Sequence, residues 1–327
     1  MSSIIKSHVI GIDINVVTTT IAVVDVRGTI LGTKSLATNA FPNVNSFVET
    51  VATHAVELAE ETCGLENVRS VGVSAPSANA ITGGLENPIN MQWKGDSIPL
   101  AAMLRDRLGL AVAVGNDAHA TAMGEFVYGS AHGMKNFIVI SLGHGGVGSC
   151  FFSNGQDHLG SHGFAGEVGH ACIAKDGREC SCGRKGCLET YASDRGIVQT
   201  AKELLAESDK PSLMRQLEKL TPMNIGACCD QNDELAWEVY RRTGKILGLA
   251  LANYASVINP ETIILTGEQT QVYKWLGQSL EEAFEANVFG NIRDKVKMVV
   301  STFDNEERDV LGASALAWTV KEYSLFL

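Results

Sequence analysis

One histidine and three closely spaced cysteines form the strongest chemical signal in the sequence. His170 is followed by Cys180, Cys182 and Cys187, with glycines and other turn-forming residues between the cysteines. An imidazole and three thiolates are a closed tetrahedral ligand set for Zn²⁺, and tight turns let such ligands converge on one ion. The alternative is a surface loop of reduced cysteines, but cysteines at this density are difficult to place as core packing. The pattern therefore predicts a structural zinc site.

Two glutamates flank the predicted metal site. Glu167 lies three residues before His170, and Glu189 lies two residues after Cys187, so a bound ion would hold both carboxylates near one place. Carboxylates held in this way can accept hydrogen bonds from a polar ligand. His170 can bind zinc through one ring nitrogen and a ligand hydroxyl through the other. The metal loop is therefore expected to support a binding site for a polar ligand.

The order of these residues resembles a known family signature. The run GE-x-GH followed by C-x-CG-x-x-GC-x-E is similar to the zinc-loop signature of the ROK family, which comprises repressors, open reading frames and sugar kinases. The likeness extends over nearly the whole chain and is strongest to glucokinase-like members. It implies that Glu167, His170 and Glu189 contact hexose hydroxyls and that the protein is a homodimer. It also implies a sugar contact from Asn90, which lies in the run NPINMQWKG.

A carboxylate stands where a predicted strand meets a predicted helix. The run AVAVGN leads into Asn116 and Asp117 and then into a helical pattern. From the residues alone, a carboxylate at this point is best explained as a helix N-cap. The ROK resemblance instead places Asp117, in NDAHATAMGE, at the position of the general base. It implies that Asp117 takes a proton from the primary hydroxyl of a hexose as that oxygen attacks the γ-phosphorus of ATP, while Asn116 holds a neighbouring hydroxyl.

The nucleotide side departs from the pattern of the same family. Sugar kinases of the family begin with DxGGT, whose glycines let the backbone approach the ATP phosphates, but this chain has DINVV from Asp13. In the second phosphate loop, LGHGGVG, His144 replaces a threonine, and Glu268 replaces one glycine of a later pair. The resemblance still implies that ATP binds together with Mg²⁺. The positions it implies on the nucleotide side are Asp13, Gly143, His144, Gly145 and Gly267, and the hydroxyl of Thr18 is a candidate replacement for the missing glycines of the first loop.

Two functions are consistent with these residues. The first is an ATP- and Mg²⁺-dependent hexose kinase acting on glucose or a close relative, which the retention of Asp13 and Asp117 favours. The second is a hexose sensor without phosphoryl transfer. It is favoured by the nucleotide-side residues Asn15, Val16, Val17, His144 and Glu268. A zinc hydrolase is disfavoured, because four protein ligands leave no position for a metal-bound water.

The elements that must position these residues alternate between strands and helices. Runs of β-branched residues broken by short turns predict strands, and apolar residues at helical spacing predict helices. The polar stretch 207–234 shows little pattern and is expected to be a surface excursion. The expected strands are 8–14, 19–26, 29–38, 70–75, 111–116, 136–143, 147–155, 261–267 and 296–302. The expected helices are 43–62, 97–108, a run after Asp117, 194–206, 232–258, 271–287 and 310–323.

This order of elements is that of the actin-like ATPase (ribonuclease H-like) fold, an α/β fold in which two α/β domains enclose a cleft. The ROK resemblance implies the same fold and a last helix that returns to the first domain. We therefore expect a smaller N-terminal domain from residues 1–117 plus 310–327. The larger domain, residues 118–309, is expected to carry the zinc loop.

Composition and charge restrict the partners. The 327 residues are 45% hydrophobic and 19% charged, which is ordinary for a globular protein of two domains. A net charge of −11 argues against nucleic acid or an anionic membrane as a partner. Because the first strand is predicted to begin near His8, the DNA-binding helix-turn-helix of ROK repressors is not expected. Because neither a signal peptide nor an apolar run of roughly 20 residues is visible, a cytoplasmic protein without structural disulfides is expected.

Overall fold

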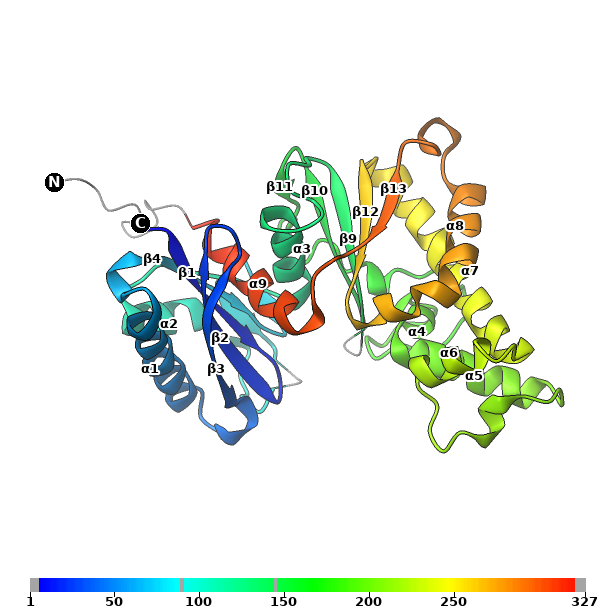
Figure 1. Cartoon of the computed structure of the whole chain (residues 1–327), viewed down its shortest axis with the longest axis horizontal. Coiled ribbons are helices and arrows are strands. Elements are labelled where there is room, and N and C mark those ends of the chain that lie inside the picture. The colour runs from blue at the N-terminus through cyan, green and yellow to red at the C-terminus, as the bar shows by residue number, and fades with distance from the viewer. Residues whose placement is uncertain (1–5, 89–90, 144–145, 321–327) are drawn as a thin grey trace. The chain divides into compact units, whose positions relative to one another are not determined.

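The computed structural model describes residues 6–88, 91–143 and 146–320 of the chain. The chain forms two compact units, each built around its own five-stranded sheet (Figure 1). Unit 1 contains the described parts of Met1–Gly133, Leu159–Ala165 and Thr302–Leu327, and unit 2 contains those of Met134–His158 and Gly166–Ser301. The chain therefore passes between the units more than once, and its C-terminal part belongs to unit 1.

The sheet of unit 1 contains the strands that were predicted for the N-terminal part. In spatial order it is formed by β3 (Ile30–Ala37), β2 (Thr18–Asp25), β1 (His8–Ile14), β4 (Val68–Ser74) and β8 (Val112–Gly115). The first three strands are antiparallel to one another, so the predicted meander is confirmed. β4 is parallel to β1, and β8 is parallel to β4.

α1 (Val44–Thr62) and α2 (Leu100–Leu108) cover one face of this sheet (Figure 1). Side chains alternate between the two faces of a strand, and Ile10 and Ile12 of β1 point toward these helices and join their core cluster. The apolar stripe predicted for α1 is confirmed. Its buried residues include Phe47, Val48, Val51, Ala55, Leu58 and Ala59.

α9 (Asn305–Ala317) covers the opposite face of the sheet at short range. Gly72 of β4 allows this approach, because a Cβ at that position would lie 2.0 Å from the carbonyl oxygen of Ala313. The helix begins and ends earlier than the predicted range 310–323. Its first turn is rich in charged residues, which show no apolar pattern, so the helix start could not be recognised from the sequence.

α3 (Asp117–Val127) packs against α9 and belongs to unit 1. A Cβ on Gly124 would lie only 3.2 Å from the Cα of Gly312, so the two helices meet through glycines. The first passage into unit 2 follows Gly133, later than the boundary after Asp117 that the sequence suggested. The reason is the contact with α9, which follows α3 in the chain by more than 170 residues.

A second, small sheet in unit 1 was not predicted. It is formed by the antiparallel strands β5 (Ala78–Asn79), β6 (Gly84–Glu86) and β7 (Ser97–Ile98). The sequence suggested a loop and then a helix from residue 97, because strands of two or three residues are too short to show an alternating pattern.

The sheet of unit 2 repeats the arrangement of unit 1. In spatial order it is formed by β11 (Gln156–Asp157), β10 (Gly146–Ser153), β9 (Phe137–Gly143), β12 (Thr262–Thr266) and β13 (Lys297–Val300). The first three strands are again antiparallel, and β12 and β13 continue the sheet in parallel with β9. The predicted hairpin and the two later strands are therefore confirmed.

Two long helices, α7 (Glu234–Ile258) and α8 (Tyr273–Asn287), pack closely in unit 2. Gly244 of α7 permits the contact, because a Cβ there would lie 2.6 Å from the carbonyl oxygen of Leu276. Both helices agree with the predicted ranges to within two residues. Two further helices follow the metal loop, α4 (Glu189–Ala192) and α5 (Asp194–Glu207).

The stretch 207–234 is not only a surface excursion, so that expectation was wrong in part. It contains α6 (Pro222–Cys229), which is capped reciprocally by Thr221 and Asn224 and contacts α7. Ile225 and Cys228 are buried in the core of unit 2. At 8 residues the helix is shorter than the window of about 11–18 residues in which a helical apolar pattern can be recognised, which is why the sequence pattern missed it.

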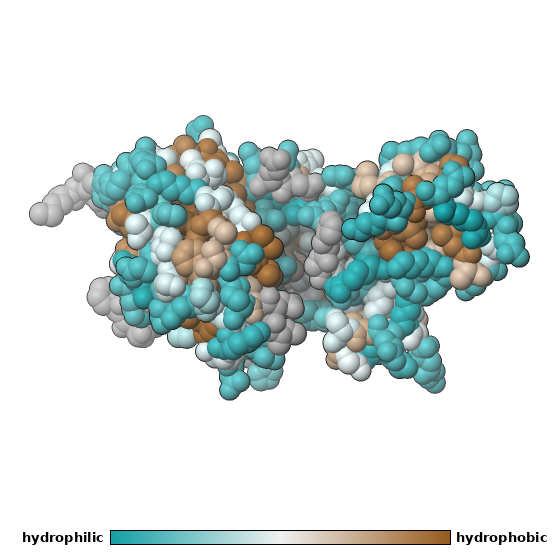
Figure 2. Space-filling view, turned by 90° about the horizontal axis from the view of Figure 1, so that it is seen from below, coloured by the Kyte–Doolittle hydropathy of each residue, from teal (hydrophilic) through white to brown (hydrophobic). Residues whose placement is uncertain are grey.

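Hydrophilic residues cover most of the surface shown in Figure 2, and hydrophobic residues gather in smaller groups between them. Some large hydrophobic side chains are nevertheless exposed, including Val17 at 61% and Val257 at 81%. Across the described residues, no helix has both the length and the apolar character needed to cross a membrane.

Candidate active site and metal centre

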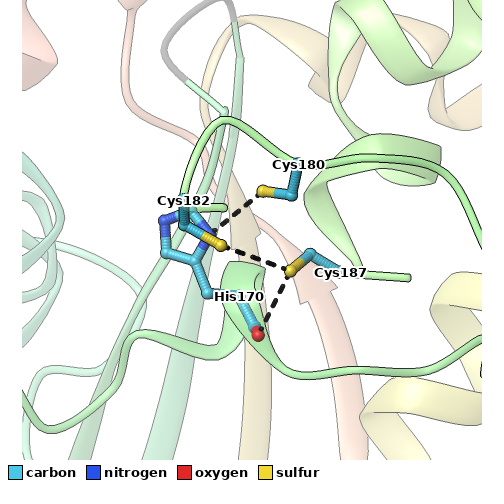
Figure 3. A group of neighbouring side chains, drawn as sticks. All are labelled: His170, Cys180, Cys182 and Cys187. Carbon is cyan, nitrogen blue, oxygen red and sulfur yellow. Dashed lines mark hydrogen bonds between the residues drawn. The ribbon is translucent and has the colours of Figure 1, made fainter. Parts of the chain in front are cut away.

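The four predicted metal ligands come together in unit 2, and their ligand atoms all lie within 4.8 Å of one another. His170 Nδ1 is 3.6 Å from Cys180 Sγ, and Cys182 Sγ is 3.7 Å from Cys187 Sγ (Figure 3). In a tetrahedral site with Zn–S bonds of about 2.3 Å and Zn–N bonds of about 2.0 Å, neighbouring ligand atoms are about 3.5–3.8 Å apart. The arrangement therefore fits Zn²⁺, as the sequence predicted.

His170 presents its two ring nitrogens in different directions. Nδ1 faces the sulfurs, whereas Nε2 lies on the far side of the ring (Figure 3). The residue ends a short 3-10 turn, Val168–His170, that packs tightly on β10. A Cβ on Gly169 would lie 2.1 Å from the carbonyl oxygen of Val147. The backbone thus fixes a ring that can offer one nitrogen to a metal and the other to a ligand hydroxyl.

Backbone hydrogen bonds fold the metal loop into a tight knuckle. The Cys180 amide donates to the Arg184 carbonyl oxygen at 2.8 Å, and the Gly183 amide donates back to the Cys180 carbonyl oxygen at 3.0 Å. Gly183 has a φ of +83°, a conformation that favours glycine. The Arg184 guanidinium donates to the His170 carbonyl oxygen at 2.8 Å. These contacts hold the cysteine-bearing turn beside the histidine.

Arg178 fastens the same loop to α5. Its guanidinium donates to both carboxylate oxygens of Glu203, and to the carbonyl oxygens of Thr190 and Gly196. It also lies 4.5 Å from the centre of the Tyr191 ring. Sequence reasoning gave Arg178 no role, because its partners lie 12 to 25 residues away and follow no local pattern.

The thiols of the cluster differ in proton affinity. The backbone amide and the guanidinium of Arg184 lower the pKa of Cys182 to about 6. Burial, together with the neighbouring sulfurs of Cys180 and Cys182, raises the pKa of Cys187 to about 12. Zinc binds thiolates, so a bound ion must displace the Cys187 proton, and metal affinity should fall as the pH falls.

The two flanking glutamates lie on either side of the metal ligands in the chain, and both belong to unit 2. Glu189 is half-buried at the start of α4, and its Oε2 accepts a hydrogen bond of 3.4 Å from the Val147 amide. The same carboxylate lies against Gly146, where a Cβ would be only 1.9 Å from Oε2. Glu167 is exposed directly before the turn that carries His170. Glu189 therefore contacts the start of β10, a link that the sequence did not reveal.

Asn116 and Asp117 lie in unit 1, where β8 ends and α3 begins. Asn116, rather than Asp117, is the N-cap, because its Oδ1 accepts a hydrogen bond from the His119 amide at 2.7 Å. Asp117 is the first helical residue, and its Oδ1 accepts from the Ala118 amide at 2.9 Å. The side chain is open to solvent, yet loss of hydration in its surroundings raises its pKa, and Asp309 raises it further. The N-cap role that the sequence pattern favoured for Asp117 therefore belongs to Asn116.

Asp13 lies near the end of β1 and is only 7% exposed. Burial, together with the nearby carboxylates of Asp309 and Asp117, raises its pKa to about 7. A hydrogen bond with Ser74 and the positive charge of Arg308 act in the opposite direction. Asp13 and Asp117, which the sequence assigned to separate roles, are therefore close enough to influence each other's charge.

Two residues of α9 join this charged group and were missed in the sequence. Arg308 Nε lies 2.9 Å from Asp309 Oδ1, and the Arg308 side chain is 9% exposed. The only available signal was the charged run EERD before an apolar helical pattern. It could not show that the run returns to the first sheet.

The turn between β1 and β2 keeps an ordinary backbone without glycine. Val16 and Val17 are 40% and 61% exposed, and neither has a positive φ. The Asn15 amide donates to the Thr18 carbonyl oxygen at 2.9 Å, and its side chain donates to Asp13 Oδ2 at 2.7 Å. The exposed valine side chains therefore stand where glycines would let a backbone approach phosphates.

The remaining nucleotide-side residues lie at the ends of β9 and β12. Gly267 has no room for a side chain, because a Cβ there would lie 2.2 Å from the Leu142 carbonyl oxygen. Glu268 is exposed, and its Oε2 is 3.7 Å from the position of a Cβ on Gly143. The carboxylate that the sequence placed on the nucleotide side is thus beside Gly143. Asn90, His144 and Gly145 lie outside the described residues.

The fold and the metal loop together define the class of this protein. Both sheets have three antiparallel strands followed by two parallel ones, and the second unit carries a Cys₃His loop. This duplicated arrangement is that of the actin-like ATPase fold, so the predicted fold class is confirmed. The chain belongs to the ROK family, whose family model matches residues 9–320.

Similar proteins include kinases and a regulator. A glucokinase of Halalkalibacterium halodurans is 34% identical over 257 residues, which cover 77% of this chain and 76% of that protein. A ROK glucokinase from Streptomyces griseus, solved with glucose and AMPPNP, is 28% identical with a TM-score of 0.73, covering 96% of this chain and 100% of its own. A ROK transcriptional regulator, described as a homologue of the Escherichia coli Mlc protein, is 26% identical with a TM-score of 0.84. The match covers 96% of this chain and 78% of the regulator's chain.

Proposed function

We propose that this protein is a glucokinase-like hexose kinase, which transfers the γ-phosphoryl group of ATP to the primary hydroxyl of glucose or a close relative. Asp117 carries the proposal. It is the first residue of α3, it is open to solvent, and its pKa is raised, which together suit a general base. Similarity to glucokinases over most of the chain supports the same reaction.

In the proposed reaction, Asp117 takes the proton of the sugar hydroxyl as that oxygen attacks the γ-phosphorus. The Ala118 amide already bonds to Oδ1 of Asp117, which favours Oδ2 as the proton acceptor. Asn116 uses its Oδ1 in the helix cap, so its Nδ2 is the group that donates to a neighbouring hydroxyl. Asn90 belongs to the same set of proposed sugar contacts.

The metal loop supplies the other proposed sugar contacts. His170 binds a hydroxyl through Nε2, and the carboxylates of Glu167 and Glu189 accept hydrogen bonds from further hydroxyls. A bound Zn²⁺ would hold the loop in shape, and its four protein ligands leave it no catalytic water. Several such groups around one small ligand allow hexoses to be distinguished, because each unmet hydroxyl partner carries a penalty.

On the nucleotide side, the ionised form of Asp13 is proposed to organise the Mg²⁺–phosphate region. The hydroxyl of Thr18 and the backbone at Gly143, Gly145 and Gly267 face the nucleotide in this proposal, as does His144. A homodimer and a cytoplasmic location, both expected from the sequence, belong to the same proposal.

A coupled assay of ADP release against a panel of hexoses tests the kinase function. Hexose-dependent ADP release is expected, and Asp117→Asn should lower kcat by about 10²–10⁴-fold, the usual contribution of general base catalysis. Hexose affinity, measured by titration calorimetry, should change far less. Asp106→Asn is a matched control, because this carboxylate is 65% exposed on α2 and should leave the rate unchanged. Equal rates for Asp117→Asn and wild type would exclude the assigned base.

A hexose sensor without phosphoryl transfer is the second candidate. The exposed side chains of Val16 and Val17, and the Glu268 carboxylate beside Gly143, are the observations that favour it. The negative charge of the Glu268 carboxylate would repel a phosphate group, and Val16 and Val17 replace the glycines of the first phosphate loop. Hexose binding without measurable affinity for ATP·Mg²⁺ would establish this function in place of the kinase.

A further inference from the structure

A further cysteine of the metal loop, Cys172, lies directly opposite the ligand Cys187. The two residues face each other in a short antiparallel bridge. Hydrogen bonds cross between their neighbours on either side, so the cysteines form the closer, non-hydrogen-bonded type of cross-strand pair, with Cα atoms about 4.5 Å apart. The flanking bonds run from the Ile173 amide to the Gly186 carbonyl oxygen at 2.9 Å, and from the Leu188 amide to the Ala171 carbonyl oxygen at 3.0 Å.

This geometry is compatible with a disulfide bond. Disulfides span Cα separations of about 4.4–6.8 Å, and the side chains of a cross-strand pair leave the same face of the ribbon. The Cys172 sulfur lies beside Gly186, the residue before Cys187, at 3.3 Å from the position that a Cβ on Gly186 would take. Side-chain rotation can therefore join the sulfurs of Cys172 and Cys187.

The two sulfurs differ in their surroundings. Cys187 is 0% exposed, and its sulfur lies 3.7 Å from that of Cys182 within the predicted zinc site. Cys172 is exposed and lies outside the four-ligand cluster. A dissolved oxidant therefore reaches Cys172 more readily, and the backbone pairing holds Cys187 opposite it.

We propose that Cys172 and Cys187 form a redox-controlled release for the zinc ion. Hydrogen peroxide oxidises the Cys172 thiolate to a sulfenic acid, and the second peroxide oxygen leaves as hydroxide, which becomes water on protonation. The Cys187 sulfur then attacks the Cys172 sulfur, the S–O bond breaks, and the hydroxyl group leaves as a second water. Overall, two thiols and one peroxide give one disulfide and two waters. Cys187 can no longer bind the metal, so the remaining three ligands release it.

Release of the ion would also loosen the turn that holds His170. Hexose affinity should then fall, and this consequence rests on the proposed function. Disulfide formation and zinc release do not rest on it, because they concern the metal loop alone and can be measured without substrate.

Treatment of the zinc-loaded protein with hydrogen peroxide tests the proposal. A chromogenic chelator follows zinc release, and mass spectrometry of non-reduced peptides identifies the disulfide. Wild type should release about one zinc per chain and yield the Cys172–Cys187 link, and a thiol reductant with added zinc should restore the site. Cys172→Ser should slow release at least about tenfold, since the attack of peroxide on the exposed thiolate is removed.

Cys63→Ser is the matched control, because Cys63 is a half-buried thiol in unit 1 and should not affect release. Cys172→Ala checks that the serine hydroxyl has no effect of its own, and the peptide map of wild type gives an answer even if a variant misfolds. A Cys180–Cys182 or Cys182–Cys187 link as the main product would overturn the proposal, as would equal release by Cys172→Ser and wild type. A purified protein without zinc would overturn it together with the metal site.

Discussion

Compared with wild type, the variant Asp13→Asn should have a more stable unit 1, and this gain should be larger at alkaline pH than at acidic pH. In the folded protein the pKa of Asp13 is raised from 3.8 to about 7, mainly by burial, so the folded state binds the proton more tightly than the unfolded state. As the pH rises from about 4 to about 7, the unfolded chain ionises freely while the folded chain does so at a cost. The wild type therefore loses stability over this window and gains none of it back above pH 7.

The magnitude follows from the size of the pKa shift. A raise from 3.8 to about 7 corresponds to about 4 kcal/mol of destabilisation above pH 7, at about 1.4 kcal/mol per pKa unit. By pH 5 part of this has already been lost, which leaves a change of about 2–3 kcal/mol between pH 5 and pH 8. Asparagine has nearly the same shape and no charge, so this change disappears in the variant. The variant's free energy of unfolding, relative to wild type, should therefore rise by that amount from pH 5 to pH 8.

Urea unfolding at the two pH values measures this difference. Amide exchange of peptides from β1 and β4 would report unit 1 separately from unit 2, and Asp106→Asn controls for the loss of an exposed carboxylate. The same relative stability of Asp13→Asn at both pH values would refute the reasoning, and would mean that Ser74 and Arg308 fully compensate for burial. The variant should also lose phosphoryl transfer if Asp13 organises the phosphate region, so the charge would lower stability while serving activity.

Three further predictions concern the metal loop, the contact of α9 and the nucleotide turn. Cys182→Ala should remove zinc and weaken hexose binding at least about tenfold, by metal analysis and titration calorimetry, because the loop loses its support; full hexose binding by zinc-free protein would contradict this. Gly72→Ala should destabilise unit 1 by about 2 kcal/mol or more, because the new Cβ would lie 2.0 Å from the Ala313 carbonyl oxygen. Gly290→Ala is the control: its Cβ would have nothing within 4 Å, so the free energy of unfolding should change by no more than about 0.5 kcal/mol. Val16→Gly combined with Val17→Gly should tighten ATP·Mg²⁺ binding at least about tenfold, because glycine lets the backbone approach phosphates. An unchanged calorimetric titration would show that the first loop does not limit nucleotide affinity.

The metal ligands and the long elements could be predicted because their signals are local. Four ligands within one loop identify the metal site by type and spacing, and α1 repeats its apolar residues over a long run. The predicted positions for Asn116 and Asp117 also held, because a strand end and a helix start are adjacent in sequence. For these residues, local geometry follows from a few neighbours.

Other features depend on contacts between distant parts of the chain. Arg308 and Asp309 approach Asp13 only because α9 packs on the first sheet, and no pattern near residue 308 shows this. The capping role of Asn116 required the actual dihedral angles at the helix start, since both Asn and Asp favour that position. The link from Glu189 to the Val147 amide crosses 42 residues and likewise has no sequence signature.

The return of α9 to unit 1 has a consequence for the order of events during synthesis. Val9, Ala22 and Val24 form a small core with α9, and among the described elements α9 is the helix that packs most extensively on the glycine-lined face of β1 and β4. A ribosome completes all of unit 2 before it makes this helix. Until then, the nascent first sheet keeps an apolar face exposed, as it also would in any product that stops short of residue 305. Such chains need protection from aggregation, and unit 1 can mature only after the polypeptide is almost complete.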